Sequence, residues 1–178
     1  MKIRTVLILV VLFAAVLFAM MKQNPAPESD QAFPTLPEVN YQAPVFELND
    51  LMGKPFALTK GKPVLLNFWA TWCPPCKAET PDLVAVSEAY GDQVTFIGVN
   101  VTTQDTMEDV RRFAADYQVS YPIVLDETGE VTKQYRVSAM PTSFVLDAQG
   151  VIVYKKVGPM TAAEMKRIID PLLTRGGS

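Results

Sequence analysis

The only two cysteines of the chain, Cys73 and Cys76, enclose two prolines and lie between segments of different periodicity. An apolar run at residues 64–68 is typical of a strand buried on both faces, and residues 77–90 follow with a helical pattern. The first sulfur would then lie at a helix N-terminus, where unpaired backbone N–H groups and the helix dipole favour a thiolate. Because the thiolate is the form that attacks disulfides, this arrangement predicts a redox-active pair.

A structural or metal-binding role for the cysteine pair has less support. A structural disulfide at this spacing would stabilise the chain little, because the loop that it closes is short. Half of a metal site shared between two chains is a further alternative, but the chain has no histidine, and two cysteines alone cannot complete a four-ligand zinc site. We therefore expect no metal and no other cofactor. The formal net charge of −3, without any basic run, also argues against a nucleic-acid partner.

Strands and helices alternate along most of the chain. Apolar patterns predict strands at residues 43–48, 56–58, 64–68, 94–101, 123–125, 142–146 and 151–157. Helical periodicity predicts helices at residues 77–90, 106–117 and 130–135, and a last helix that begins at Thr161 with Glu164 in a capping box. The short connection at residues 147–150 makes the last two strands an antiparallel hairpin. We expect an α/β fold, in which a central mixed β-sheet has helices on both faces.

The N-terminus is a separate segment. Lys2 and Arg4 precede an unbroken apolar run at residues 6–21, whose length is near the lower limit for spanning a bilayer. We expect residues 1–22 to be a retained signal anchor, a transmembrane helix, with a cleaved signal peptide as the alternative. The basic residues favour a cytoplasmic N-terminus and an exported domain. We therefore expect a single-pass protein of the cell membrane with its catalytic domain on the extracytoplasmic side.

A tether is expected after the anchor. Residues 23–40 contain four prolines and few apolar side chains, which is typical of a semi-extended linker. The apolar patterns begin after it, so we expect the folded domain to occupy residues 41–178.

The cysteine motif has a wider context. Residues 67–77, Asn-Phe-Trp-Ala-Thr-Trp-Cys-Pro-Pro-Cys-Lys, resemble the active site of the thioredoxin superfamily. Pro81 matches a helix-bending proline of that family, and residues 140–142, Met-Pro-Thr, open a later strand where the family has a cis-proline. The resemblance covers residues 41–173 and implies a thioredoxin-like fold that carries out thiol–disulfide exchange.

Further features are similar to one branch of that superfamily, the membrane-anchored TlpA/ResA-like proteins. They are the opening segment at residues 43–48 with Gly53 and Lys54 behind it, the acid Glu79, and the longer segment between the two matched regions.

The resemblance implies a role for each matched residue. Cys73 is the attacking thiolate and should be the more exposed sulfur, and Cys76 resolves the mixed disulfide. A cis peptide bond at Pro141 would present the backbone of Met140 to an extended substrate segment beside Cys73. Trp72 is expected to be an exposed apolar platform for a partner protein.

Three nearby side chains have two interpretations each. Trp69 is either packed in the core or a shelf at the site, and Lys77 is either a solvated lysine or an electrostatic partner of the thiolate. Glu79 is either a first-turn acid favoured by the helix dipole or, as the resemblance implies, an acid near the cysteines that shuttles a thiol proton. Thioredoxins usually carry a buried Asp where this chain has Asn67. An amide cannot transfer a proton in that way, so the task should fall to Glu79 or water.

These features predict a membrane-tethered thiol–disulfide oxidoreductase that reduces protein disulfides. The resemblance implies clients such as the oxidised Cys-x-x-Cys-His haem-attachment motif of apocytochrome c, and a membrane thiol-electron donor that recycles the protein. A disulfide-forming oxidant or isomerase is the alternative enzyme. A binding module that carries copper on two thiolates, or that senses redox state, is a weaker alternative because the chain has no histidine and no further cysteine.

Overall fold

The computed structural model describes residue 13 and residues 34–175. The strands are β1 (Glu47–Asp50), β2 (Pro55–Ala57), β3 (Val64–Trp69), β4 (Thr95–Asn100), β5 (Ile123–Leu125), β6 (Thr142–Leu146) and β7 (Ile152–Val157). The helices are α2 (Pro74–Tyr90), α3 (Met107–Asp116), α4 (Glu130–Gln134) and α5 (Ala162–Arg175), with short 3-10 helices η1 (Gly91–Gln93) and η2 (Thr102–Gln104).

The strands form one mixed sheet in the order β2-β1-β5-β4-β3-β6-β7. Strand β3 pairs in parallel with β4, β4 pairs in parallel with β5, and β6 and β7 form the antiparallel hairpin that the sequence predicts. The fully buried strand β3 also pairs antiparallel with β6, with Phe68 opposite Thr142. The end of β3 that leads to the cysteines therefore lies beside the start of β6, where Pro141 precedes the strand.

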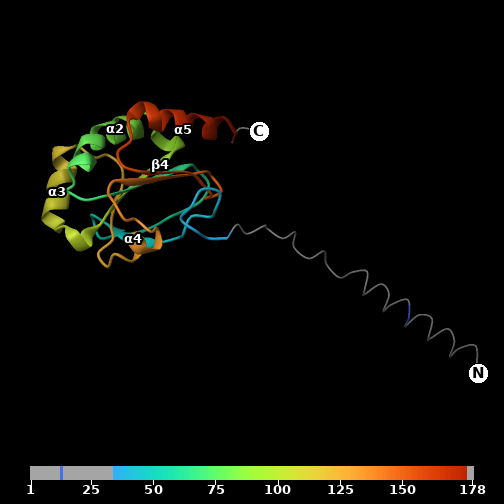
Figure 1. Cartoon of the computed structure of the whole chain (residues 1–178), viewed down its shortest axis with the longest axis horizontal. Helices are drawn as coiled ribbons and strands as arrows, with labels where there is room; N and C mark the ends of the chain where they lie inside the picture. The colour runs from blue at the N-terminus through green and yellow to red at the C-terminus, as the bar shows by residue number, and fades with distance from the viewer. Residues whose placement is uncertain (1–12, 14–33, 176–178) are drawn as a thin grey trace, which may run out of the picture. The chain divides into compact units, whose positions relative to one another are not determined.

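Helices cover both faces of the sheet, as expected. Figure 1 shows α2 and α5 together on one side of the strands and α4 on the other. Side-chain alternation along β3 agrees, because Leu65 packs with residues of α2 and α5, whereas Phe68 packs against Tyr135 beyond α4. On the first face, Trp69 packs against Phe113 of α3, so this face carries three helices.

The folded structure begins earlier than the predicted boundary at residue 41. Asn40 N donates to Ile152 O over 2.8 Å, and Ile152 N donates to Tyr41 O over 2.9 Å. The Lys155 ammonium donates to the carbonyl oxygen of buried Pro37 over 3.1 Å. Residues 34–40, assigned to the tether from their composition, therefore contact β7, because backbone pairing and one buried proline offset their polar character. The rest of the predicted tether lies outside the described residues.

Most other element boundaries differ from the prediction by a single residue. Two differ more. Helix α2 begins at Pro74 rather than at residue 77, because prolines fit the first helical turn, where the missing N–H has no partner to lose. The first strand covers Glu47–Asp50 rather than residues 43–48; Ala43 and Phe46 are buried as the pattern implied, but in an irregular segment around Pro44.

The predicted anchor at residues 1–22 lies outside the described residues apart from Phe13. Among the helices that the structure describes, none combines the length and the apolar character needed to cross a bilayer.

Candidate active site

Cys73 and Cys76 form a disulfide at the N-terminus of α2. Cys73 is the residue that caps this helix, with extended backbone angles, and its Sγ accepts a hydrogen bond of 3.3 Å from the backbone N–H of Cys76. In the reduced protein, this N–H and the positive end of the helix dipole stabilise negative charge on the Cys73 sulfur. The local geometry is therefore that of a nucleophilic cysteine, as the strand–motif–helix pattern predicts.

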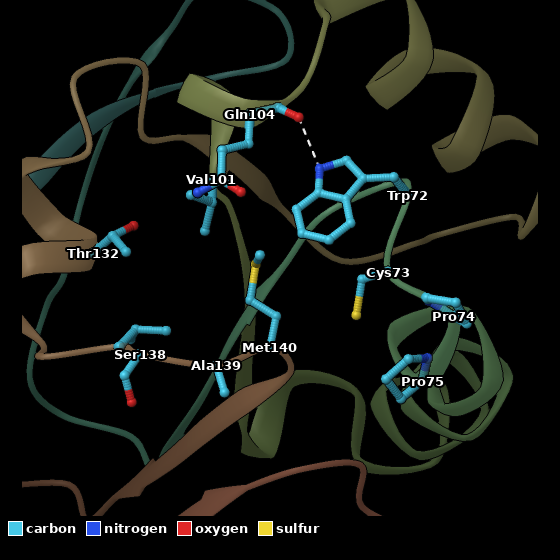
Figure 2. Close-up of a pocket in the computed structure, with 11 residues that line it drawn as sticks. Trp72, Cys73, Pro74, Pro75, Val101, Gln104, Thr132, Ser138, Ala139 and Met140 are labelled. Atoms are coloured by element: carbon cyan, nitrogen blue, oxygen red, sulfur yellow. Dashed lines mark hydrogen bonds between the residues drawn. The ribbon is translucent and has the colours of Figure 1, made fainter.

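Both cysteines are buried. Cys73 is 3% exposed and Cys76 is 1% exposed, so the order of exposure agrees with the prediction but the difference is small. What separates them is access: Cys73 lines a pocket, whereas Cys76 does not line it, and Figure 2 shows the Cys73 sulfur pointing into that pocket. A substrate disulfide can thus reach Cys73 from the pocket.

The pocket has a volume of about 340 Å³ and no charged side chain lines it. Its walls come from the cysteine loop with the start of α2, the end of β4 with η2, helix α4 and the segment before β6. The lining residues are Trp72, Cys73, Pro74, Pro75, Val101, Gln104, Thr132, Val137, Ser138, Ala139 and Met140. Such a surface suits an uncharged peptide segment, because burying a charged side chain there would leave it without a partner.

The two tryptophans have different environments. Trp72 is 51% exposed and borders the pocket, and its Nε1 donates to Gln104 O over 2.7 Å (Figure 2). Its position fits the predicted platform. Trp69 is 5% exposed and its ring centre lies 4.4 Å from that of Phe113, so it is packed in the core. Lys77 is exposed, as a solvated helix lysine would be.

The Met140–Pro141 peptide bond is cis, as the sequence predicts. Met140 lines the pocket, and Figure 2 places its side chain between the Trp72 ring and Ala139. Because β6 runs antiparallel to β3, the segment that precedes β6 and the loop that follows β3 meet at one edge of the sheet. The structure therefore brings Met140 to the pocket that Cys73 also lines, and Pro141 follows it at the start of β6.

Glu79 is buried on the inner side of α2, with 3% of its surface exposed. Its Oε1 accepts a hydrogen bond from Asn67 Nδ2 over 2.6 Å, and its Oε2 accepts one from Met160 N over 2.9 Å. Burial raises the pKa of Glu79 to about 7, although both hydrogen bonds and the charge of Lys156 act in the opposite direction. The interpretation of Glu79 as a first-turn acid is wrong, because α2 begins early enough to place it in the second turn.

Asn67 explains how the chain accommodates this buried acid. It lies in β3 at the position where thioredoxins usually carry Asp, and its Nδ2 donates both to Glu79 and to Ser143 Oγ, the latter over 3.0 Å. An amide donates where a second carboxylate would repel, so Asn67 and Glu79 are compatible in one buried site. Sequence reasoning did not identify Ser143 or the backbone of Met160, since nothing in a strand serine or a loop methionine signals such a contact.

A second polar cluster lies on the other side of the cysteine loop. The Asp105 carboxylate accepts hydrogen bonds from Thr71 N over 2.7 Å, from Thr71 Oγ1 and from Asn100 Nδ2 over 3.0 Å. Sequence reasoning missed Asp105, because an acid directly before Thr106 reads as part of a helix start. No group of three or more potential metal-ligating side chains is present among residues that the structure describes.

A redox-active cysteine pair at a helix N-terminus, next to a cis-proline on a mixed sheet, defines a thiol–disulfide oxidoreductase of the thioredoxin fold. The chain belongs to the Redoxin family, which matches residues 38–170.

Relatives agree with this assignment. The chain is 42% identical over 132 residues to the thioredoxin-like protein YneN of Bacillus subtilis, which covers 72% of this chain and 77% of that protein. It is 34% identical over 140 residues to the thiol-disulfide oxidoreductase ResA of Bacillus thuringiensis, covering 76% and 79%. The crystal structure of StoA from Bacillus subtilis superposes with a TM-score of 0.64 at 35% identity, covering 76% of this chain and 98% of that one. The protein is thus a thiol–disulfide oxidoreductase of the ResA/StoA type, and the predicted TlpA/ResA-like family is confirmed.

Proposed function

We propose that the protein reduces disulfides of exported proteins on the extracytoplasmic side of the cell membrane, with residues 1–22 as its anchor. The observation that carries thiol–disulfide exchange is the environment of the cysteines: a stabilised nucleophile, Cys73, beside an uncharged pocket, and a buried acid, Glu79, whose pKa near neutrality lets it take up a thiol proton. The reductive direction is supported by the resemblance to the ResA-like proteins, because a stabilised thiolate alone does not make a protein a reductant. The oxidised Cys-x-x-Cys-His motif of apocytochrome c is the client that the ResA-like sequence features support.

The reaction transfers two electrons from the protein to its client. The Cys73 thiolate attacks one sulfur of the client disulfide, which forms a mixed disulfide and releases the other client sulfur as a thiolate. Cys76 then loses its proton to Glu79 or water and attacks Cys73 Sγ. This step forms the Cys73–Cys76 disulfide and releases the second client sulfur, and both client thiolates take up protons from the surrounding water.

The oxidised product must be reduced again before the next cycle. An exported protein has no access to cytosolic thiols, so the electrons must come from a donor that carries thiols at the membrane. An anchored chain would keep the domain close to such a donor and to clients that emerge from the membrane.

Trapping tests the proposed function. In Cys76→Ser, the mixed disulfide on Cys73 cannot resolve, so clients should accumulate as adducts that a reductant releases. The experiment expresses full-length Cys76→Ser in membranes of the native host, isolates the adducts and identifies them by mass spectrometry. Cys73→Ser is the matched control, because it keeps one cysteine but lacks the pocket-facing sulfur. Adducts with cytochrome c precursors would support apocytochrome c as the client. Adducts with other exported proteins would support disulfide reduction but not this client. Equal adducts in both variants would refute the proposed function.

The direction of electron flow needs a separate measurement. Pre-reduced protein is mixed with an oxidised Cys-x-x-Cys-His peptide, and pre-oxidised protein with the reduced peptide. A reductant should react faster and further in the first mixture. Faster oxidation of the reduced peptide would instead favour a disulfide-forming enzyme.

Membrane-impermeant maleimide tests the location. After mild reduction, protoplasts or spheroplasts that express the full chain should be labelled at Cys73 without lysis if the domain lies outside. Labelling that requires lysis would refute the extracytoplasmic location. Because the chain holds only two cysteines, the Cys73→Ser,Cys76→Ser double variant gives the background.

A further inference from the structure

Asp105 joins three parts of the structure that meet beside the pocket. Its carboxylate accepts hydrogen bonds from Thr71 in the loop before the cysteines, from Asn100 at the end of β4, and from Thr106 N at the start of α3 over 3.2 Å. Thr71 donates through both its backbone N–H and its hydroxyl. Asn100 is fully buried and is itself held by Thr102 Oγ1, which donates to its side-chain oxygen over 3.0 Å.

Capping of α3 does not explain this arrangement. Thr106 already caps the helix, since its Oγ1 accepts a hydrogen bond of 3.1 Å from Asp109 N. Most of the hydrogen bonds to Asp105 come instead from the residue two positions before the nucleophile and from the buried end of β4. The carboxylate therefore links the cysteine loop to the sheet.

The same link fixes one wall of the pocket. Trp72 follows Thr71 directly, and its indole N–H donates to the carbonyl of Gln104, the residue that precedes Asp105. Trp72 and Gln104 both line the pocket. Two adjacent residues of one segment thus hold two adjacent residues of the cysteine loop, and Figure 2 shows the indole spanning the distance between that segment and Cys73.

We propose that Asp105 is a positioning residue that holds the Trp72 wall of the pocket and so determines how well a peptide disulfide fits beside Cys73. The proposal concerns thiol–disulfide exchange itself and does not depend on which protein is the client or where the domain lies. The hydrogen bonds that the structure gives Asp105 go to Thr71, Asn100 and Thr106 rather than to a sulfur, so it acts through Thr71 and, by way of its neighbour Gln104, through Trp72.

Asp105→Asn is the first test. The substitution keeps the shape but places an amide N–H₂ where Thr71 and Asn100 both donate, so at least one hydrogen bond is lost. We expect the half-saturating concentration of a peptide closed by a Cys-x-x-Cys disulfide to rise about tenfold, the equivalent of one such contact, while the maximal rate stays within about twofold. The rate with 2-hydroxyethyl disulfide, which needs no wall, should also stay within about twofold. Asp109→Asn, which removes the same charge at the same helix start without touching the loop, should match the parent protein.

Thr71 provides a pair of variants for the case in which Asp105→Asn does not fold. Thr71→Val deletes the hydroxyl at constant size and should raise the half-saturating concentration of the peptide, as Asp105→Asn does. Thr71→Ser retains the hydroxyl and should keep that concentration at the parent value. Acrylamide quenching of tryptophan fluorescence should increase in Asp105→Asn and Thr71→Val only, because Trp72 is the exposed indole and Trp69 is buried.

Two results would overturn the proposal. One is an equal loss of rate with the peptide and with 2-hydroxyethyl disulfide, which would mean that Asp105 affects the thiolate rather than the fit. The other is a half-saturating peptide concentration that stays at the parent value in both Asp105→Asn and Thr71→Val. Neither result would bear on the trapping experiment, which depends on Cys73 and Cys76 alone.

Discussion

The Glu79 carboxylate and the Asn67 amide form a buried hydrogen bond of 2.6 Å that joins helix α2 to strand β3. Glu79 and Cys76 are three residues apart on α2, the spacing at which helix side chains are neighbours, and both are buried. We predict two effects of an acid in this position, and they can be measured separately. It should make the stability of the fold depend on pH, and it should accept the proton that Cys76 loses.

Glu79→Gln should remove a pH dependence of stability in the oxidised protein. Burial raises the folded-state pKa of Glu79 from 4.5 to about 7, so between these values the folded protein holds a proton that the unfolded chain has released. Stability should therefore fall as pH rises through this window, by at most about 3 kcal/mol, and should level off above it. Urea unfolding at about pH 5 and about pH 8 measures the fall. Glu88→Gln, on the exposed side of the same helix, should show the same decrease in stability with pH as the parent protein. If Glu79→Gln also shows this decrease, another group causes it.

Glu79→Gln should also slow the resolving step. Cys76 must lose its proton before it attacks Cys73, and only the ionised form of Glu79 accepts one, so the rate of resolution in the parent protein should rise with pH through about 7. Loss of a general base of this kind slows a step about a hundredfold. Acid quenching during a single turnover should then reveal mixed disulfide on Cys73 that persists in the variant. If the mixed disulfide decays as fast as in the parent protein, water rather than Glu79 takes the proton.

The sequence predicted the architecture because its signals were local. Continuous apolar runs identified the buried strands, and the short connection at residues 147–150 identified the hairpin, where Asp147 Oδ1 accepts from Gln149 N and Val151 N over 2.9 Å each. The predicted capping box at the last helix formed only in part. Thr161 Oγ1 accepts from Glu164 N over 3.3 Å, but the Glu164 carboxylate binds Lys156 and Tyr154. The partners of that side chain come from the preceding strand, β7, and the helix-start pattern does not contain them.

In the site, too, the features with a local signal were predicted, and the contacts with other segments were not. The cysteines, the cis-proline and the exposed Trp72 follow from a motif or from the family resemblance. The burial of Glu79 does not. Helical spacing puts it on the same face as Leu83 and Val86, but an acid is ordinarily solvated, and the donors that satisfy it when buried, Asn67 Nδ2 and Met160 N, come from other segments. Asp105 shows the limit most clearly: its partner Thr71 is a distant residue in sequence, and only the parallel pairing of β3 with β4 brings the ends of the two strands together.

Alkylation should distinguish the two cysteines of the reduced protein. Cys73 faces the pocket and its sulfur accepts the N–H of Cys76, whereas Cys76 lies behind it in the first turn of α2. Iodoacetamide at neutral pH should therefore modify Cys73 at least about tenfold faster than Cys76, since a stabilised and accessible thiolate reacts first. Peptide mapping by mass spectrometry gives the ratio, and Cys73→Ser gives the rate of Cys76 on its own. Preferential modification of Cys76 would reverse the assigned roles of nucleophile and resolving residue.

Tyr135→Phe should weaken the fold while sparing the chemistry. Tyr135 is fully buried, packs between Phe68 and Phe144, and donates a hydrogen bond of 2.6 Å from its hydroxyl to Pro44 O. Phenylalanine keeps the ring contacts but leaves that carbonyl without its partner in the interior, at a cost of about 1–3 kcal/mol.

The measurement is urea unfolding of the oxidised protein, together with the rate of peptide reduction. The rate should remain within about twofold of the parent value, because the ring that supports α4 is retained. Tyr154→Phe is the matched control: its hydroxyl donates to Glu164 over 2.9 Å in a partly buried position, so water can replace the lost contact and the decrease in stability should be smaller. Equal losses in the two variants would contradict the view that the Tyr135–Pro44 contact fastens the segment before β1 to the core.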